Sequence, residues 1–346
     1  MNKKIIIILF ALIIVLSFAA GTVLLLTRNS GEEAQEELVP TKSTAKILDQ
    51  PIVSAVPSFD STAIWYFDRL GKLFRVNPDG TGLSEFTLPP WPPNGDLAGV
   101  KWPARGNDFI AWASSVTGTT KHYFDNASAQ YTTWPANIQS FDWMPDGRRV
   151  VYIWQAGDKL SQQLVMANAD TSGFRIVAEV FWPDLKVYAS PNGLEALLVR
   201  AKPEGDTNKI YKADLNSGEF EIVIGEKKNL GALWLPNGQK FLFTQESDGQ
   251  LAKVLLYDFT TRLQTDLNLK TNFEKVALDS TGNTLFAAVP KANLAGEMFV
   301  KVDLTTFQQE VIYDPDKPIT AKNLFFANGN LYYINSADNK LYFITE

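Results

Sequence analysis

The chain of 346 residues has no cysteine and a single histidine, His122. Without cysteine there is no disulfide framework, thiolate metal site or cysteine nucleophile. With one histidine, a zinc site lacks ligands and a serine triad would have to use His122 as its base, yet no Gly-x-Ser-x-Gly motif is present. A lone strand histidine is usually either exposed or satisfied by its neighbours. We therefore expect no catalytic, metal-ligating or cofactor-binding residues.

Blocks of positive charge are also lacking after the first few residues, and the formal net charge is −6. A protein that binds nucleic acid needs a basic surface, so nucleic-acid partners are excluded. Aromatic residues make up 12% of the chain, with 22 glycines and 18 prolines. This composition favours many short strands joined by tight turns over a helical bundle.

One long apolar run stands at the N-terminus, from Ile5 to Leu26, after Lys3 and Lys4. A helix of that length covers about 33 Å, which matches the hydrocarbon core of a bilayer. Lysines before the span and glutamates after it place residues 1–4 in the cytoplasm and the rest outside. A cleaved signal peptide, cut near residues 18–21, is the alternative, but the apolar run continues past that point. We expect a retained single-pass anchor in the cell membrane.

Residues 27–44 are rich in Glu, Ser, Thr, Gly and Gln and contain almost no large apolar side chain. Such a segment cannot bury enough surface to fold, so we expect a flexible linker. The remaining residues, 45–346, form the folded domain.

That domain consists of a repeated unit. A turn signature, mostly ending in glycine, recurs about every 41 to 47 residues, close to the period of a four-stranded propeller blade. It occurs at Asp60-Ser61, Arg105-Gly106, Asp146-Gly147, Asn192-Gly193, Asn237-Gly238, Thr281-Gly282 and Asn328-Gly329. A second marker, a turn aspartate or asparagine, follows later in the unit at Asn77, Asp125, Asn168, Asp214, Asp258 and Asp303. The two phased markers predict an all-β, seven-bladed β-propeller, with six or eight blades as alternatives.

The last unit ends before a fourth strand could form. A strand-like segment, Lys46 to Ile52, precedes the first unit and has no blade of its own. We expect it to complete the last blade, because closing the ring removes open sheet edges.

A third marker lies four residues before each of these turns, at Pro57, Trp102, Trp143, Ala189, Trp234, Leu278 and Phe325. Mostly large apolar residues at one place in every unit predict packing between neighbouring blades. The segments Phe141 to Tyr152 and Leu233 to Phe243 each contain an aromatic residue, a Pro-Asp/Asn-Gly turn and an apolar strand. These repeats resemble the TolB-like subgroup of WD-type propellers over residues 45–346. The resemblance implies a propeller scaffold outside the cytoplasm but no single activity.

The aspartates Asp60, Asp146, Asp214, Asp258 and Asp303 all lie at recurring turns, which indicates turn geometry rather than chemistry. A different constellation suggests binding. Trp-Pro pairs follow three successive units, at Trp91, Trp134 and Trp182. Tryptophan on a proline-stiffened loop is typical of binding hot spots, although the three rings could instead fill gaps between blades.

We therefore expect a membrane-anchored, extracytoplasmic propeller that acts as a binding or scaffold module for an envelope protein or glycan, with Trp91, Trp134 and Trp182 as its candidate binding face. The alternative is a carboxylate-dependent hydrolase of cell-envelope carbohydrate, because the spacing of paired carboxylates cannot be read from a sequence. A purely structural part of a membrane complex is the third hypothesis.

Overall fold

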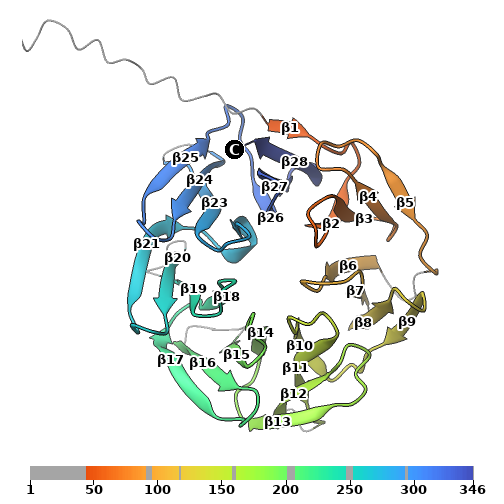
Figure 1. Cartoon of the computed structure of the whole chain (residues 1–346), viewed down its shortest axis with the longest axis vertical. Coiled ribbons are helices and arrows are strands. Elements are labelled where there is room, and N and C mark those ends of the chain that lie inside the picture. The colour runs from red at the N-terminus through yellow and green to blue at the C-terminus, as the bar shows by residue number, and fades with distance from the viewer. Residues whose placement is uncertain are drawn as a thin grey trace, which may run out of the picture. The chain divides into compact units, whose positions relative to one another are not determined.

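The computed structural model describes residues 44–90, 96–116, 118–157, 161–200, 207–246, 252–292 and 295–345. Its strands form seven separate four-stranded antiparallel sheets, which stand as blades around a central axis (Figure 1). The seven-bladed all-β propeller is thus confirmed. Among these residues no helix is long and apolar enough to cross a membrane. The predicted span, residues 5–26, lies outside the described residues, as does the predicted linker up to residue 43.

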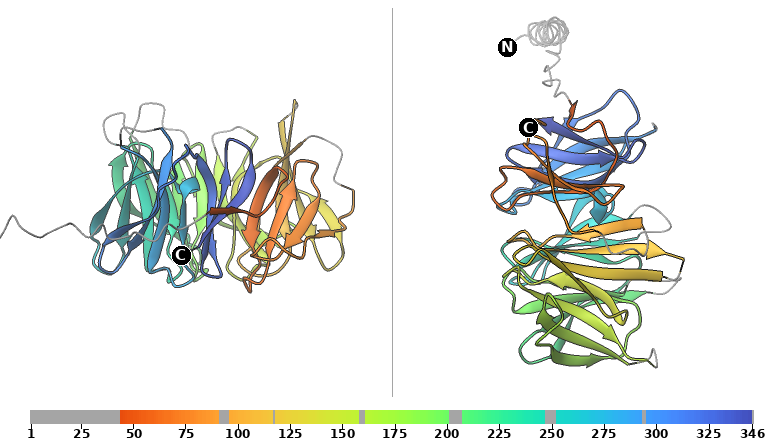
Figure 2. Two further views of the ribbon diagram at one scale, coloured as in Figure 1. Left: turned by 90° about the horizontal axis from the view of Figure 1, so that it is seen from above. Right: turned by 90° about the vertical axis from the view of Figure 1, so that its right-hand side faces the viewer.

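Six blades are meanders of four consecutive strands, and in all seven the strands occupy four equivalent positions from the axis outwards (Figures 1 and 2). The innermost strands are β2 Ile52–Pro57, β6 Asp96–Lys101, β10 Ile138–Trp143, β14 Leu185–Ala189, β18 Gly231–Trp234, β22 Val276–Leu278 and β26 Ala321–Ala327. The second strands are β3 Ile64–Asp68, β7 Phe109–Ser115, β11 Arg149–Gln155, β15 Glu195–Arg200, β19 Lys240–Gln245, β23 Thr284–Pro290 and β27 Asn330–Asn335. The third strands are β4 Leu73–Val76, β8 Gly118–Asp125, β12 Gln162–Asn168, β16 Asn208–Asp214, β20 Lys253–Asp258, β24 Glu297–Asp303 and β28 Lys340–Thr345. The outermost strands are β5 Ser84–Phe86, β9 Gln130–Thr133, β13 Arg175–Val180, β17 Phe220–Lys227, β21 Gln264–Lys270, β25 Gln309–Tyr313 and β1 Thr44–Lys46. One 3-10 turn, η1 Phe273–Lys275, precedes β22.

The ring is closed by the two ends of the propeller domain. Strand β1 pairs antiparallel with β28, so the last blade takes its outer strand from before the first blade (Figure 1). The closing strand is shorter and begins earlier than the predicted Lys46 to Ile52. Beyond it, the Ile47 N–H still donates to the Leu341 carbonyl at 2.9 Å.

The recurring glycine turn lies between the first and second strands of every blade. All six glycines, and Ser61 in the first blade, have positive φ, from 57° at Ser61 to 94° at Gly106. Glycine adopts this region at little cost, which explains its recurrence. Successive turns also pack on each other, because a Cβ added at Gly147 would lie 2.2 Å from the carbonyl oxygen of Arg105 in the preceding blade.

The second marker forms Asx turns in four of its six positions. The side chains of Asp125, Asp214, Asp258 and Asp303 each accept an N–H bond from two residues on. In the other two units this bond goes to an aspartate further on, Asp79 or Asp170.

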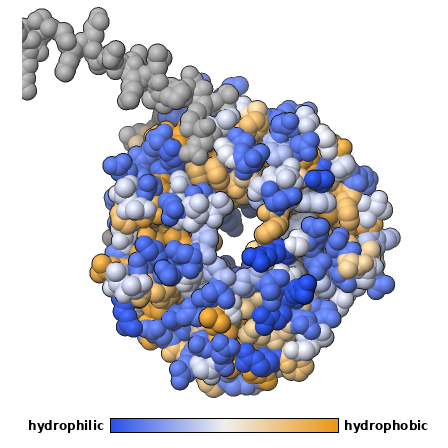
Figure 3. Space-filling view, viewed as in Figure 1, coloured by the Kyte–Doolittle hydropathy of each residue, from blue (hydrophilic) through white to orange (hydrophobic). Residues whose placement is uncertain are grey.

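The core consists of seven hydrophobic clusters, each shared by two adjacent blades. One cluster, for example, joins Val151 on β11 to Leu198 on β15, and another joins Phe67 on β3 to Phe109 on β7. Burial at these seams, at about 25 cal/mol per Å² of apolar surface, holds the blades together. It also leaves the innermost strands facing a channel along the axis, whose opening Figure 3 shows.

Candidate functional site

The channel widens into a cavity at each end. One cavity, of about 690 Å³, is lined by the recurring glycine turns and the ends of the innermost strands, and we call it the turn-side cavity. The other, of about 840 Å³, is lined by residues of the innermost strands and by Trp112, Ser114, Thr119 and Lys121, and we call it the loop-side cavity. The boundary falls at one level in three consecutive blades, between Lys101 and Trp102, Phe141 and Asp142, and Tyr188 and Ala189.

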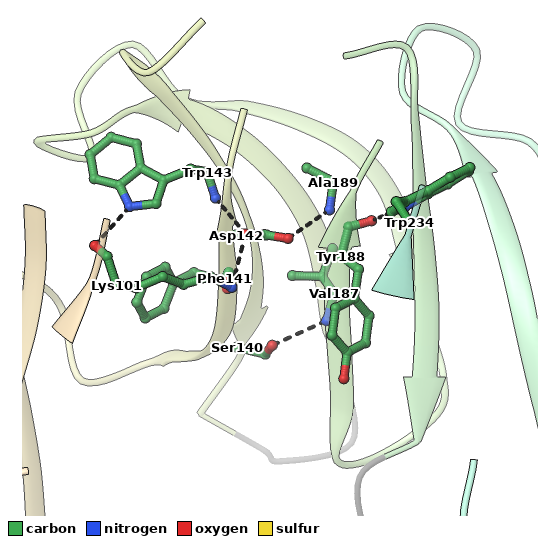
Figure 4. Close-up of polar contacts among 9 residues, drawn as sticks. All are labelled: Lys101, Ser140, Phe141, Asp142, Trp143, Val187, Tyr188, Ala189 and Trp234. Carbon is green, nitrogen blue, oxygen red and sulfur yellow. Dashed lines mark hydrogen bonds and ion pairs between the residues drawn. The ribbon is translucent and has the colours of Figure 1, made fainter. Parts of the chain in front are cut away.

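A belt of hydrogen bonds links the blades at this boundary (Figure 4). The Ser140 hydroxyl accepts the Val187 N–H at 3.1 Å, and Asp142 Oδ2 accepts the Ala189 N–H at 3.0 Å. These two side chains alternate on β10, so they present acceptors to β14 at the spacing of a strand's own carbonyls. The belt fixes blades three and four against each other at the channel wall.

Asp142 is fully engaged within this belt. Its Oδ1 lies 2.8 Å from Lys101 Nζ and accepts the Trp143 N–H at 2.9 Å, while its Oδ2 is bound by Ala189. It is the only carboxylate among the described residues that line the turn-side cavity. Through these three contacts Asp142, which belongs to blade three, connects Lys101 of blade two to Ala189 of blade four.

Tryptophans form much of the wall of the turn-side cavity, at Trp65, Trp102, Trp143 and Trp234. Two of them use their indole N–H to join neighbouring blades. Trp143 Nε1 donates to the Lys101 carbonyl and Trp234 Nε1 donates to the Tyr188 carbonyl, each at 3.0 Å (Figure 4). The prediction that this marker packs between blades is confirmed for these two, but their place in a cavity wall was not predicted.

The rim of the turn-side cavity carries Phe59 and Arg105. The Phe59 side chain is 69% exposed, and the Arg105 guanidinium lies 5.8 Å from the centre of its ring. An exposed aromatic ring beside a cation offers both apolar and charged contacts, a combination that is typical of binding hot spots. Arg105 belongs to the recurring turn signature and Phe59 directly precedes it, but only the folded arrangement shows that the two side chains lie together at a cavity rim.

The tryptophans of the predicted binding face do not form one surface at a cavity. Trp134 is only 4% exposed, and its Nε1 donates to the Ala169 carbonyl at 2.8 Å, so it fills the seam between blades two and three. Trp182 is half-buried and stacks on Tyr211 with ring centres 4.1 Å apart. Trp91 lies outside the described residues. Neither Trp134 nor Trp182 lines either channel cavity.

His122 is in the third strand of blade two, as predicted, and is 5% exposed. Its ring nitrogens lie 3.3 Å from Thr120 Oγ1 and 3.2 Å from Thr133 Oγ1. Burial lowers its pKa, so the ring is neutral at pH 7. This arrangement agrees with a histidine satisfied by its neighbours.

The loop-side cavity combines aromatic and basic residues. Trp112 on β7 lies directly across from Lys121 on β8, and the Phe141 ring meets Trp112 edge to face at 6.2 Å. Gly99 makes room for the indole, since a Cβ there would lie 2.2 Å from Trp112 Cζ2. Burial, with a smaller effect of the Asp142 carboxylate, raises the pKa of Tyr188 to about 12, so its hydroxyl remains a donor.

No protein-family model and no curated protein matches the chain. Among solved structures it is similar to an oligogalacturonate lyase from Vibrio parahaemolyticus, with a TM-score of 0.63 and 10% identity over 88% of this chain and 95% of that one. An oligogalacturonate lyase in complex with manganese gives a TM-score of 0.63 and 9% identity, over 88% and 93% of the two chains. TolB from Acinetobacter baumannii gives a TM-score of 0.48 and 13% identity over 75% of this chain, which spans 62% of the TolB chain.

At these identities the likeness shows the propeller fold alone. The likeness favours neither a catalytic nor a binding role. No group of three or more His, Asp or Glu residues in the described part of the chain could hold a metal ion.

Proposed function

We propose that this chain is a membrane-tethered binding module that holds a segment of an envelope protein or a glycan in the turn-side cavity. The observation that carries the proposal is the chemistry of that cavity. Four tryptophans form part of its wall, Phe59 and Arg105 stand exposed at its rim, and the only carboxylate in its described lining is held in an ion pair. Large, rigid aromatic surfaces with few polar groups suit recognition.

The alternative, a carboxylate-dependent hydrolase, would need an acid and a second carboxylate about 5 to 9.5 Å apart. In the turn-side cavity Asp142 has no second carboxylate beside it in the described lining. The loop-side cavity contains Asp184 and Glu274, both with exposed side chains. Release of sugar from envelope polysaccharide by the wild type, lost in Asp184→Asn or Glu274→Gln, would favour the hydrolase.

The binding proposal is tested with the full-length chain on immobilised envelope glycans and on detergent-solubilised envelope proteins. We expect one class to be retained by the wild type and bound at least about ten-fold more weakly by Phe59→Ala with Arg105→Ala, because both are rim contacts of hot-spot type. Leu70→Ala is the matched control, since Leu70 is 80% exposed and lines neither channel cavity. Equal retention by the double variant would refute the proposed site.

The proposed location outside the cytoplasm has its own test. The chain has no cysteine, so a single Leu70→Cys substitution gives the protein one reactive thiol. In intact cells a membrane-impermeant maleimide should label this thiol as completely as it does after lysis. Labelling only after lysis would place the propeller in the cytoplasm and would remove envelope ligands from consideration.

A further inference from the structure

Lys121 carries a charge that no side chain of the described protein neutralises. It extends from β8 of blade two to the start of β10 in blade three, where Nζ donates to the Ile138 carbonyl at 2.8 Å. The residue is half-buried, and no carboxylate of the described residues lies within ion-pair distance of it. By contrast Lys101, in the same cavity, is paired with Asp142. Partly buried charges are normally paired with an opposite charge. The surroundings of Lys121 are therefore suited to binding an anion from outside the chain.

The neighbours of Lys121 define what kind of anion could reach it. Trp112 lies directly across the strand pair and supplies an apolar wall, while Thr119 and Gln139 supply hydrogen-bonding groups in the same lining. The cavity of about 840 Å³ is large enough for a small organic molecule. Its remaining charged residues, Lys186, Asp184 and Glu274, are all exposed. Burial also lowers the pKa of Lys121, as expected for an ammonium group without a counter-charge.

We propose that the loop-side cavity binds a small organic acid, with its carboxylate on Lys121 and its apolar part against Trp112. This site is separate from the turn-side cavity, and its ligand differs from an envelope protein or glycan. The carboxylate would replace water around Nζ with a charge-assisted hydrogen bond, which is among the stronger polar contacts in proteins. The indole would exclude water from one side of that bond and strengthen it.

Three probe molecules separate the two parts of this ligand. Benzoate has a ring and a carboxylate, acetate has the carboxylate alone, and benzyl alcohol has the ring without the charge. Saturation-transfer NMR on the full-length chain should show saturable benzoate binding at up to about 10 mM, weaker binding of acetate, and none of benzyl alcohol, as expected of weak fragments that need both contacts.

The decisive variant is Lys121→Met, which keeps the length of the side chain and removes its charge. Benzoate should bind this variant at least about ten-fold more weakly, the effect of losing one charge-assisted hydrogen bond. Lys253→Met is the control, because Lys253 is paired with Asp266 and lies outside this cavity. A thermal midpoint of Lys121→Met at or above that of the wild type would show that the fold is intact; if the variant does not fold, Lys121→Gln replaces it.

Two results would overturn the proposal. The first is that benzoate does not saturate the wild type, and the second is that it binds Lys121→Met and the wild type equally. Phe59→Ala with Arg105→Ala should leave benzoate binding unchanged, since both residues line the opposite cavity. A failure of the turn-side proposal is therefore distinguishable from a failure of this one.

Discussion

The indole N–H of Trp143 donates to the carbonyl of Lys101 at 3.0 Å, across the seam between blades two and three. Trp234 makes the same bond to Tyr188 across the seam between blades four and five. Trp102 occupies the matching place in blade two, but its buried Nε1 has no hydrogen-bond partner among the described residues. The same side chain at the same level is therefore bonded at two seams and unbonded at a third.

This difference predicts the effect of removing each indole N–H. Trp143→Phe leaves the Lys101 carbonyl without its donor, whereas Trp102→Phe removes an N–H that was already unsatisfied. We expect the free energy of unfolding to fall by about 1–3 kcal/mol more for Trp143→Phe than for Trp102→Phe. Urea unfolding followed by circular dichroism measures both. Equal losses would mean that only ring packing matters at these seams.

The glycine turns provide a second matched pair. Gly147 and Gly329 have similar φ values of 68° and 75°, but a Cβ at Gly147 would lie 2.2 Å from the Arg105 carbonyl oxygen, and one at Gly329 would meet nothing within 4 Å. Gly329→Ala should cost about 1–2 kcal/mol, the penalty of the left-handed conformation alone. Gly147→Ala should cost at least about 3 kcal/mol, because the neighbouring backbone must also move. Similar midpoints of thermal unfolding for the two variants would contradict this account.

The closure of the ring predicts a local effect at Ile47. Ile47→Pro removes the N–H that donates to the Leu341 carbonyl, whereas Ile47→Ala keeps it and removes only side-chain packing. We expect the proline variant to be less stable than the alanine variant by about 1–3 kcal/mol. Hydrogen exchange should become faster in β28 and remain unchanged in β12, in blade three on the far side of the ring (Figure 1). Uniform acceleration throughout the propeller would indicate that closure stabilises every blade alike.

The turn aspartates predict a loss of stability in acid. Hydrogen bonds from the Ser58 hydroxyl, then from the N–H and hydroxyl of Thr62, lower the pKa of Asp60 from 3.8 to about 2. Backbone N–H groups, first from Ser217 and from Thr306, also lower the pKa of Asp214 and Asp303. Because the folded pKa is depressed, the stabilisation is present above the unfolded value and disappears as the pH falls through the folded value.

The urea midpoint should therefore decrease between pH values of about 4 and about 2. Asp60→Asn is the control, because its amide oxygen can accept the same hydrogen bonds but does not titrate in this range. The decrease should be smaller in that variant. Two results would contradict this account: a urea midpoint that does not change with pH, or a midpoint that falls with pH as steeply in Asp60→Asn as in the wild type. Either would show that these hydrogen bonds stabilise the charged and the protonated carboxyl groups equally.

The fold could be predicted from the sequence because its determinants are local and repeated. A positive φ at Gly106 or Gly193 is a requirement of the turn itself, so the residue type recurs wherever the turn does. Closure by the N-terminal strand followed from counting strands, although its position, Thr44–Lys46, did not. The sequence does not distinguish the residues of β1 from the extended residues that follow them, and only pairing with β28 selects the three that form β1.

The cavities could not be predicted in this way. The Trp-Pro pattern led to Trp134, which is buried in a seam, because a sequence does not show how one blade is aligned with the next. The alignment places Trp143 against Lys101, 42 positions away in the sequence, and brings Phe59 next to Arg105, 46 positions away. The lack of an ion-pair partner for Lys121 could not be predicted either, because it depends on which side chains surround the residue in the folded protein.

The most direct test of the turn-side cavity is photo-crosslinking in intact cells from position 59. Replacing Phe59 with p-benzoylphenylalanine keeps an aromatic ring at the exposed rim, and the same residue at position 70 is the control outside the cavity. We expect a discrete crosslinked protein or glycan from position 59, none from position 70, and loss of the product when Arg105→Ala is added. No product from position 59, or the same product from both positions, would contradict the assignment of this cavity as the binding site.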